Sequence, residues 1–199
     1  MPLTGPRCPT CGLPIDDEVP CVECVRQPPT RTGSVIWGEY DGVLRTAILA
    51  LKHHGHDELA RPLGSRLAAR VAVEPWCDDL SVVSWVPSHL VHRLRRGRSA
   101  ARLLAKRVAD ELGVPLVAAL RRHGLRRQAG ATRARRLALP SGAFVGRSAT
   151  IRSTTVLLVD DVTTTGRTLD LAARALRRAG ADAVYAAVMA RTPDHRRAT

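Results

Sequence analysis

Aromatic side chains are scarce in this chain of 199 residues. Phe, Tyr and Trp together make up 3% of the sequence, as one Phe, two Tyr and three Trp. Proteins that bind single-stranded nucleic acid without sequence preference usually stack the bases on aromatic rings. We therefore expect no stacking platform here, and any binding to nucleic acid would depend on the phosphate backbone and weaken with salt.

Long apolar segments are also absent from the sequence. No uninterrupted apolar run approaches the roughly 20 residues that span a bilayer, and the first residues carry no basic stretch followed by an apolar one. We therefore expect a cytoplasmic protein that does not insert into membranes. A length of 199 residues with 45% hydrophobic content suits one main domain with a small appendage.

Acidic residues and lysine are both few. The chain has 31 Lys and Arg residues against 18 Asp and Glu, which gives a formal charge of +13, and all but two of the basic residues are Arg. A field of this sign attracts polyanions, whether phosphorylated metabolites or nucleic acid. The charge alone does not choose between them, because a GC-rich genome would produce the same bias toward Arg.

Bulky aliphatic residues are few in residues 1–32, so this segment cannot bury a core of its own and needs a metal or disulfide staple. Four thiolates suit tetrahedral Zn²⁺, and two Cys-x-x-Cys pairs are typical of a zinc ribbon. We predict such a structural site over residues 1–32, whereas two disulfides or loose thiols are the alternatives that a cytosolic protein disfavours. The fifth cysteine, Cys77, is left over as a free thiol. The predicted ligands are Cys8, Cys11, Cys21 and Cys24.

Strand-like and helix-like segments alternate from residue 33 onward. Apolar runs predict strands at residues 35–40, 80–86, 114–120, 155–159 and 183–190. Apolar residues at three- and four-residue spacing predict helices at residues 41–52, 59–71, 99–112 and 166–179. The alternation is typical of a parallel sheet with flanking helices, so we predict an α/β domain over residues 33–199. Residues 121–146 fit neither pattern and are long for a connection, which indicates a functional or disordered loop.

The most specific local signal is a buried strand that leads into two acids, a hydroxyl-rich turn and a helix. Backbone N–H groups at such a turn favour a phosphate, and Thr hydroxyls add donors. Gly166 allows close approach of the ligand, while Asp160 and Asp161 can accept hydrogen bonds from two neighbouring hydroxyls. A phosphate at one end and a diol at the other describe ribose 5-phosphate. The segment reads Val156-Leu157-Leu158-Val159-Asp160-Asp161-Val162-Thr163-Thr164-Thr165-Gly166-Arg167-Thr168-Leu169.

Two common phosphate-binding motifs are missing. Neither Gly-x-x-x-x-Gly-Lys-Ser/Thr nor Gly-x-Gly-x-x-Gly occurs between a predicted strand and a helix. The acids and Thr residues of this segment could instead form only a turn and a helix cap. The second acid pair of the chain serves as a comparison for that structural interpretation. Asp78 and Asp79 precede their strand and lack a hydroxyl-rich turn after them, so we interpret that pair alone as turn chemistry.

The segment 156–169 resembles the thirteen-residue signature of type I phosphoribosyltransferases, and the whole chain resembles ComF-type proteins. The resemblance implies a type I phosphoribosyltransferase fold, with a parallel-sheet core and flanking helices, and a small N-terminal zinc-ribbon module. Further ComF-like features are the cysteine pairs, Leu51-Lys52-His53 with Gly55, Val86-Pro87, Arg96-Gly97, Gln128, Arg136 and Ala143-Phe144.

The resemblance also implies roles for individual residues. Asp160 and Asp161 would hold the ribose hydroxyls of 5-phosphoribosyl-1-pyrophosphate, which would bind together with Mg²⁺. Pro87 and Ser88 would begin the pyrophosphate loop, and Arg136 would act from a catalytic loop to neutralise the departing diphosphate. The 5′-phosphate would be cradled by Thr163, Thr164, Thr165, Gly166, Arg167 and Thr168.

Three functions agree with these residues. The first is transfer of phosphoribosyl to an unidentified acceptor, and the second is binding of single-stranded DNA or of the DNA-uptake machinery in natural transformation, which the ComF resemblance implies. The third is sensing of 5-phosphoribosyl-1-pyrophosphate without turnover, because Arg98 and Ser99 stand where family members commonly have Phe and Asn. A homodimer is compatible with each. Lys52 either reaches the site or, as is more common near the end of an amphipathic helix, decorates the surface.

Overall fold

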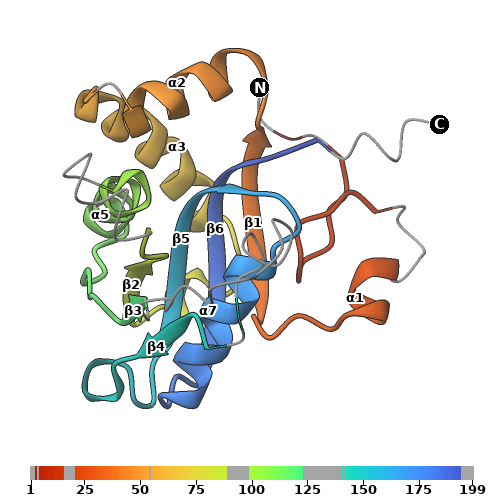
Figure 1. Ribbon diagram of the computed structural model, residues 1–199, viewed down its shortest axis with the longest axis vertical. Helices are drawn as coiled ribbons and strands as arrows, with labels where there is room; N and C mark the ends of the chain where they lie inside the picture. Colours follow the sequence, from red (N-terminus) through yellow and green to blue (C-terminus); the bar gives the residue numbers. More distant parts are fainter. Residues whose placement is uncertain are drawn as a thin grey trace, which may run out of the picture.

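The centre of the molecule is a four-stranded parallel sheet (Figure 1). The computed structural model describes residues 3, 5–15, 21–53, 55–88, 99–122, 140 and 142–193. The strands lie in the order β1-β6-β5-β2, which confirms the predicted parallel α/β core. Their bounds are Gly33–Glu39 for β1, Val82–Trp85 for β2, Thr155–Thr163 for β5 and Ala183–Arg191 for β6.

Helices cover both faces of this sheet. One face carries α2 (Gly42–His53), α3 (Ala60–Ala72) and α5 (Ala100–Leu112), and the other carries α7 (Arg167–Arg178). The side chains of β5 alternate between these two cores, so that Leu157 and Val159 pack on the first side and Val156 and Leu158 pack against α7. The continuous apolar run of β5 is therefore buried on both faces, as a central parallel strand requires. The predicted helices are confirmed to within a few residues.

The segment 114–120 is not the regular strand that its apolar pattern predicts. Leu116 forms an isolated parallel bridge with Val83, beside a hydrogen bond from the Val83 N–H to the carbonyl oxygen of Pro115 at 2.9 Å. Because Pro115 has no N–H to donate, the segment cannot continue a full ladder along β2. It lies along the edge of the sheet as irregular chain.

A short antiparallel ribbon holds the two ends of the segment that the sequence predicts as a long loop. It consists of β3 (Leu120–Arg122) and β4 (Phe144–Gly146). Gly146 lies so close to α7 that an added Cβ would be 2.6 Å from the carbonyl oxygen of Ala175. Strands of three residues are too short to show alternation, so the sequence did not predict them. The predicted loop residues Gln128 and Arg136 lie outside the described residues.

We call residues 1–32 the cysteine module, and its described residues pack along the outer strand β1. The module contains the short helix α1 (Val22–Arg26). The Leu3 N–H donates to the carbonyl oxygen of Trp37 at 2.9 Å, and the Ser34 N–H donates to that of Pro9 at 2.8 Å. These bonds cover part of an exposed sheet edge. The domain boundary near residue 33 stays a prediction. Within the described residues, no helix is long and apolar enough to cross a bilayer.

Candidate functional site

A cavity of about 370 Å³ opens at the carboxyl-terminal ends of β2 and β5. Open parallel sheets commonly bind ligands at this edge. The residues of the cavity wall come from the end of α2, the end of β2 and the chain after it, the start of α5, the end of β3, the last part of β5 and the first turn of α7. Its residues are Lys52, His53, Val86, Pro87, Ser88, Ser99, Ala100, Ala101, Arg122, Asp160, Asp161 and Thr168.

The two acids of the motif lie inside β5, not in a turn after it, because the strand continues to Thr163. Asp160 Oδ1 accepts a hydrogen bond from the backbone N–H of Asp161 at 2.9 Å. Burial, and then the charge of Asp161, raise the pKa of Asp160 well above its usual range. A carboxyl group with a raised pKa in the wall of a cavity is typical of a functional site.

Lys52 reaches the site, which is the less common of the two alternatives for a lysine at the end of an amphipathic helix. Its Nζ lies 2.8 Å from Asp161 Oδ1, and the exposed fractions of the two side chains are 27% and 15%. The ammonium group also offsets part of the rise in the pKa of Asp160. The helical pattern places Lys52 in the last turn of α2, but it cannot show that this turn ends beside β5.

Arg122, the last residue of β3, is a site residue that sequence reasoning missed. It lines the cavity, and its guanidinium carbon lies 5.6 Å from the centre of the Phe144 ring. Desolvation lowers its pKa, yet an arginine side chain remains charged at neutral pH. A half-buried guanidinium in this position suits a phosphate or diphosphate group. Arg121 and Arg122 both belong to β3, but Arg122 lines the cavity and Arg121 does not, which the sequence of this Arg-rich stretch does not indicate.

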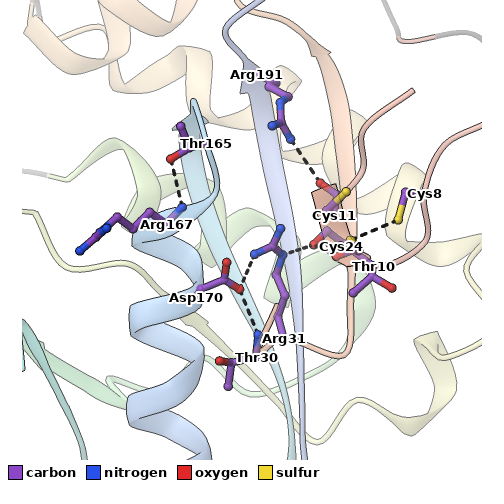
Figure 2. Close-up of polar contacts among 11 residues, drawn as sticks. Cys8, Thr10, Cys11, Cys24, Thr30, Arg31, Thr165, Arg167, Asp170 and Arg191 are labelled. Atoms are coloured by element: carbon purple, nitrogen blue, oxygen red, sulfur yellow. Dashed lines mark hydrogen bonds and ion pairs between the residues drawn. The ribbon is translucent and has the colours of Figure 1, made fainter. Parts of the chain in front are cut away.

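The cavity wall includes the first turn of α7 but not the hydroxyl-rich turn that precedes this helix. Thr168 is part of the wall, whereas Thr163, Thr164, Thr165, Gly166 and Arg167 are not. The Thr163 side chain is buried, and the Thr165 hydroxyl oxygen accepts the Arg167 N–H at 3.4 Å (Figure 2). Gly166 has a φ of 78°, a conformation that favours glycine. Phosphate binding by these six residues stays a prediction.

Of the remaining predicted site residues, two line the cavity and one lies outside the described residues. Pro87 and Ser88 follow β2 and lie in the cavity wall beside the two acids. Arg136 lies outside the described residues, so its predicted role as a catalytic residue stays a prediction. Ser99, which stands at a position where the family commonly has another residue, also lines the cavity.

A second candidate site is formed by the four cysteines of the module. Their sulfur atoms all lie within 4.8 Å of one another, with 3.7 Å between Cys8 and Cys24 and 3.5 Å between Cys11 and Cys21. These distances exceed the roughly 2.05 Å of a disulfide. They match the separation of about 3.8 Å between sulfurs that each lie about 2.3 Å from a central tetrahedral Zn²⁺. All four thiols are free, so the cluster could bind a structural zinc ion.

The electrostatics of this cluster fit a cation at its centre. Burial opposes ionisation of Cys8, but N–H groups of Cys11 and Thr10 point at its sulfur and lower its pKa to about 7. Burial raises the pKa of Cys11 to about 11. Four neighbouring thiolates repel one another, and a divalent metal removes that repulsion. The donor set therefore fits Zn²⁺.

Comparison with known sequences gives matches over most of the chain. Residues 98–199 match the phosphoribosyl transferase domain family. A protein named DNA utilization protein YhgH from Salmonella typhimurium is 28% identical, and a protein of the same name from Salmonella typhi is 29% identical. Each alignment covers 93% of this chain and 84% of the relative.

Similar solved structures include a glutamine phosphoribosylpyrophosphate amidotransferase from B. subtilis, with 20% identity and a TM-score of 0.47. That match covers 70% of this chain and 30% of the amidotransferase chain. A purine phosphoribosyltransferase from Pyrococcus horikoshii matches with 19% identity and a TM-score of 0.37, over 80% of this chain and 79% of that chain. Since the sequence match to the family takes in more than half of the residues, the chain belongs to the phosphoribosyl transferase domain family, as its resemblance to ComF-type proteins predicted.

Proposed function

We propose that this protein binds 5-phosphoribosyl-1-pyrophosphate with Mg²⁺ and transfers the phosphoribosyl group to an acceptor nucleophile. The observation that carries the proposal is the convergence of Asp160, Asp161 and Thr168 with Ser88 and Arg122 around one cavity. Membership of the phosphoribosyl transferase domain family supports the class of substrate. The cavity volume of about 370 Å³ lies within the range of small-molecule sites.

The acid pair is suited to the ribose. Two adjacent carboxylates offer acceptors for the 2′ and 3′ hydroxyls, and the ion pair with Lys52 fixes the orientation of the Asp161 side chain. Because the pKa of Asp160 is raised, the group becomes a full acceptor only when the pH exceeds that value. We therefore expect ligand affinity to increase with pH through this titration.

The two charged ends of the ligand are suited to different elements. The N-terminus of the 12-residue helix α7 carries a partial positive charge, which favours the 5′-phosphate beside Thr168. Arg122 and Ser88 offer donors for the diphosphate on the opposite wall. The carboxylates are engaged with ribose and Lys52, so Mg²⁺ would be held largely by diphosphate and ribose oxygens. When bound, Mg²⁺ would neutralise charge on the leaving diphosphate.

Transfer requires one bond exchange at C1′ of the ribose. The acceptor supplies the electron pair for the new bond, and the C1′–O bond breaks with its electron pair leaving on the diphosphate. Negative carboxylates next to the ribose stabilise the positive charge that develops on the sugar, and the Arg122 guanidinium stabilises the leaving group. A sensor would bind the same ligand without releasing diphosphate, so diphosphate release in an acceptor screen separates the two functions.

Calorimetric titration of the native chain with 5-phosphoribosyl-1-pyrophosphate and Mg²⁺ tests the proposal. We expect saturable binding that is weakened about 100-fold or more by Asp160→Asn with Asp161→Asn, because charged hydrogen bonds to two hydroxyls are lost. The matched control is Asp78→Asn with Asp79→Asn, which changes the acid pair outside the cavity and should bind like the native chain. No saturable binding by the native chain, or equal affinity in the Asp160/Asp161 variant, contradicts the proposal.

Single-stranded DNA is a second candidate ligand, and the outer face of α7 favours it. Arg174, Arg177 and Arg178 are exposed there, while the opposite face of the helix is buried against the sheet. Arginine side chains in such a row contact phosphates without reading bases. The name DNA utilization protein, carried by two relatives, agrees with a ligand of this kind.

Salt dependence of DNA binding tests this second candidate. We expect Arg174→Ala with Arg178→Ala to reduce the slope of log affinity against log salt by about 1.4, since each contact to a single-stranded phosphate contributes about 0.7. Fluorescence anisotropy of a labelled oligonucleotide measures the slope. The control Arg61→Ala with Arg66→Ala removes two exposed arginines from α3 on the other side of the sheet. Binding that is independent of salt, or an equal loss in both variants, argues against a binding face on α7.

A further inference from the structure

Arg31, near the end of the cysteine module, is a buried cation that faces the start of α7 (Figure 2). The exposed fraction of the residue is 4%. Its Nη1 donates to Asp170 Oδ1 at 2.5 Å, and its Nε donates to Ser34 Oγ at 2.6 Å. Asp170 Oδ1 also accepts the backbone N–H of Thr30 at 3.3 Å. One guanidinium therefore joins the end of the module, the outer strand β1 and the first turn of α7.

The same network extends to the cysteines. The Ser34 hydroxyl donates to the carbonyl oxygen of Thr10 at 2.7 Å, and Thr10 lies between the two cysteines of the first pair. A second connection runs from Arg191 Nη1 to the carbonyl oxygen of Cys11 at 3.3 Å (Figure 2). Both connections reach the one short loop whose thiols Cys8 and Cys11 belong to the candidate zinc site.

The two connections arrive at opposite ends of the hydroxyl-rich turn, residues 163–166. Arg191 is the partner of Thr163 in the pairing of β6 with β5, at the beginning of the turn. At its end, Gly166 leaves so little room that an added Cβ would lie 3.1 Å from a guanidinium nitrogen of Arg31. The carbonyl oxygen of Gly166 accepts the N–H of Asp170, the residue that Arg31 holds. The turn is thus held from both sides by contacts with the module.

The side chains of Arg31 and Asp170 are 3% and 27% exposed, so the guanidinium gives up its hydration to form this ion pair. Such a pair is a costly way to hold two elements together, since apolar side chains of similar volume can do so with equal or better stability. What the pair adds is a fixed relative position of the charged groups and of the backbone that carries them. We propose that Arg31 is a positioning residue for the 163–166 turn, through which the metal-bound cysteine module tightens binding of the 5′-phosphate end of the ligand. The ligand part of this inference rests on the proposed function above.

The cysteine module has a small apolar cluster, so a bound metal would contribute much of its order. Its buried cluster consists of Cys8, Cys11 and Leu13, with a few partly buried neighbours. Such a small apolar cluster fixes a loop weakly, so a metal bound by the four thiols would determine how well the Thr10 and Cys11 carbonyl oxygens are held. Loss of the metal should therefore loosen both connections to the turn.

Four variants of the full chain, one of them a control, test the role of Arg31. In Arg31→Met, we expect zinc to remain bound while the affinity for 5-phosphoribosyl-1-pyrophosphate falls about tenfold, the loss that is common when a residue that orients a binding group is removed. Arg31→Lys keeps the charge but not both hydrogen bonds, and should recover part of the affinity. Arg66→Met, an exposed arginine of α3, is the matched control and should bind like the native chain. Asp170→Asn repeats the test from the other partner if Arg31→Met does not fold.

Hydrogen exchange supplies a readout that does not depend on the ligand. We expect faster exchange of the backbone amides of residues 163–170 in Arg31→Met, and in the native chain after a zinc-selective chelator has removed the metal in the presence of Mg²⁺. Slow exchange in the centre of β6 should persist in both cases. If residues 163–170 exchange at the native rate in a folded Arg31→Met chain, or after metal removal, the inference is overturned.

The two measurements separate failure of this inference from failure of the proposed function. If the native chain does not bind 5-phosphoribosyl-1-pyrophosphate, the proposed function fails, and the exchange rates alone decide whether the module holds the turn. If the native chain binds and Arg31→Met binds equally well with its zinc in place, the proposed function stands and the positioning role is wrong.

Discussion

Replacing Asp160 by Asn should make the protein more stable while it removes the ligand site. Burial and the charge of Asp161 raise the pKa of the Asp160 carboxyl group, which means that the folded state disfavours its ionised form. Asparagine has nearly the same shape and can still accept the N–H of Asp161 through its side-chain oxygen. We expect the midpoint of thermal unfolding at neutral pH to rise by about 2 to 4 °C, the change that about 1 kcal/mol produces in a domain of this size.

The gain in stability expected for Asp160→Asn depends on pH, because the pKa of Asp160 is raised in the folded state. Below the ordinary pKa of 3.8, the carboxyl group is protonated in both the folded and the unfolded chain, so it does not oppose folding. As the pH rises toward the folded-state pKa, the unfolded chain ionises first and native stability falls. Above the folded-state pKa the penalty is complete. The difference in melting temperature between Asp160→Asn and the native chain should therefore be small near pH 4 and should increase as the pH rises, until the pH exceeds the folded-state pKa.

Calorimetric scans at several pH values, with Asp78→Asn as the control, measure this difference. Asp78 lies outside the cavity, so its replacement should leave the melting temperature unchanged. A lower melting temperature for Asp160→Asn at neutral pH would show that Asp160 stabilises the fold. A gain that is independent of pH would show that the carboxylate charge is not its cause. Retention of a destabilising carboxyl group agrees with a functional role, because sites that bind ligands commonly reduce stability.

The core of the fold could be predicted from apolar periodicity alone. The buried run of β5 and the three- to four-residue spacing in α3 and α7 are local properties of the sequence, and the structure has these elements where the patterns place them. The pattern failed at residues 114–120, where the apolar run predicted a strand but Pro115 interrupts the pairing and only Ala119 and Leu120 are buried. The end of β5 was also predicted too early, because polar residues such as Asp160 mark the end of an apolar run and not the end of a strand.

The motif predicted the part of the site whose residues are neighbours in the sequence, and the family resemblance added Pro87 and Ser88. Asp160, Asp161 and Thr168 belong to one motif, and the structure places all three at the cavity. Lys52 and Arg122 come from elements that are distant in the sequence, and their position depends on how α2 and β3 pack. Arg31 has no local signal at all, since one buried arginine among 31 basic residues can be recognised only from the residues around it.

Loss of one cysteine ligand should release the metal and unfold the cysteine module without unfolding the sheet. We expect the native chain to contain one zinc ion and Cys24→Ser to contain almost none, because a structural site with three thiolates and one hydroxyl binds far more weakly than a site with four thiolates. Amides of the module should then exchange rapidly, including that of Leu3, which is bonded to Trp37 on β1.

The fifth cysteine provides the control for this experiment. Cys77 lies outside the cluster of four thiols, so Cys77→Ser should keep one zinc ion and a native pattern of exchange. Zinc is measured by elemental analysis of the purified chains and exchange by mass spectrometry. If Cys24→Ser retains a full equivalent of zinc, the four-thiolate site is wrong. If Cys24→Ser loses the metal but the module remains protected, its contacts with β1 hold it without the metal, and the coupling between the metal and the ligand turn would fail with it.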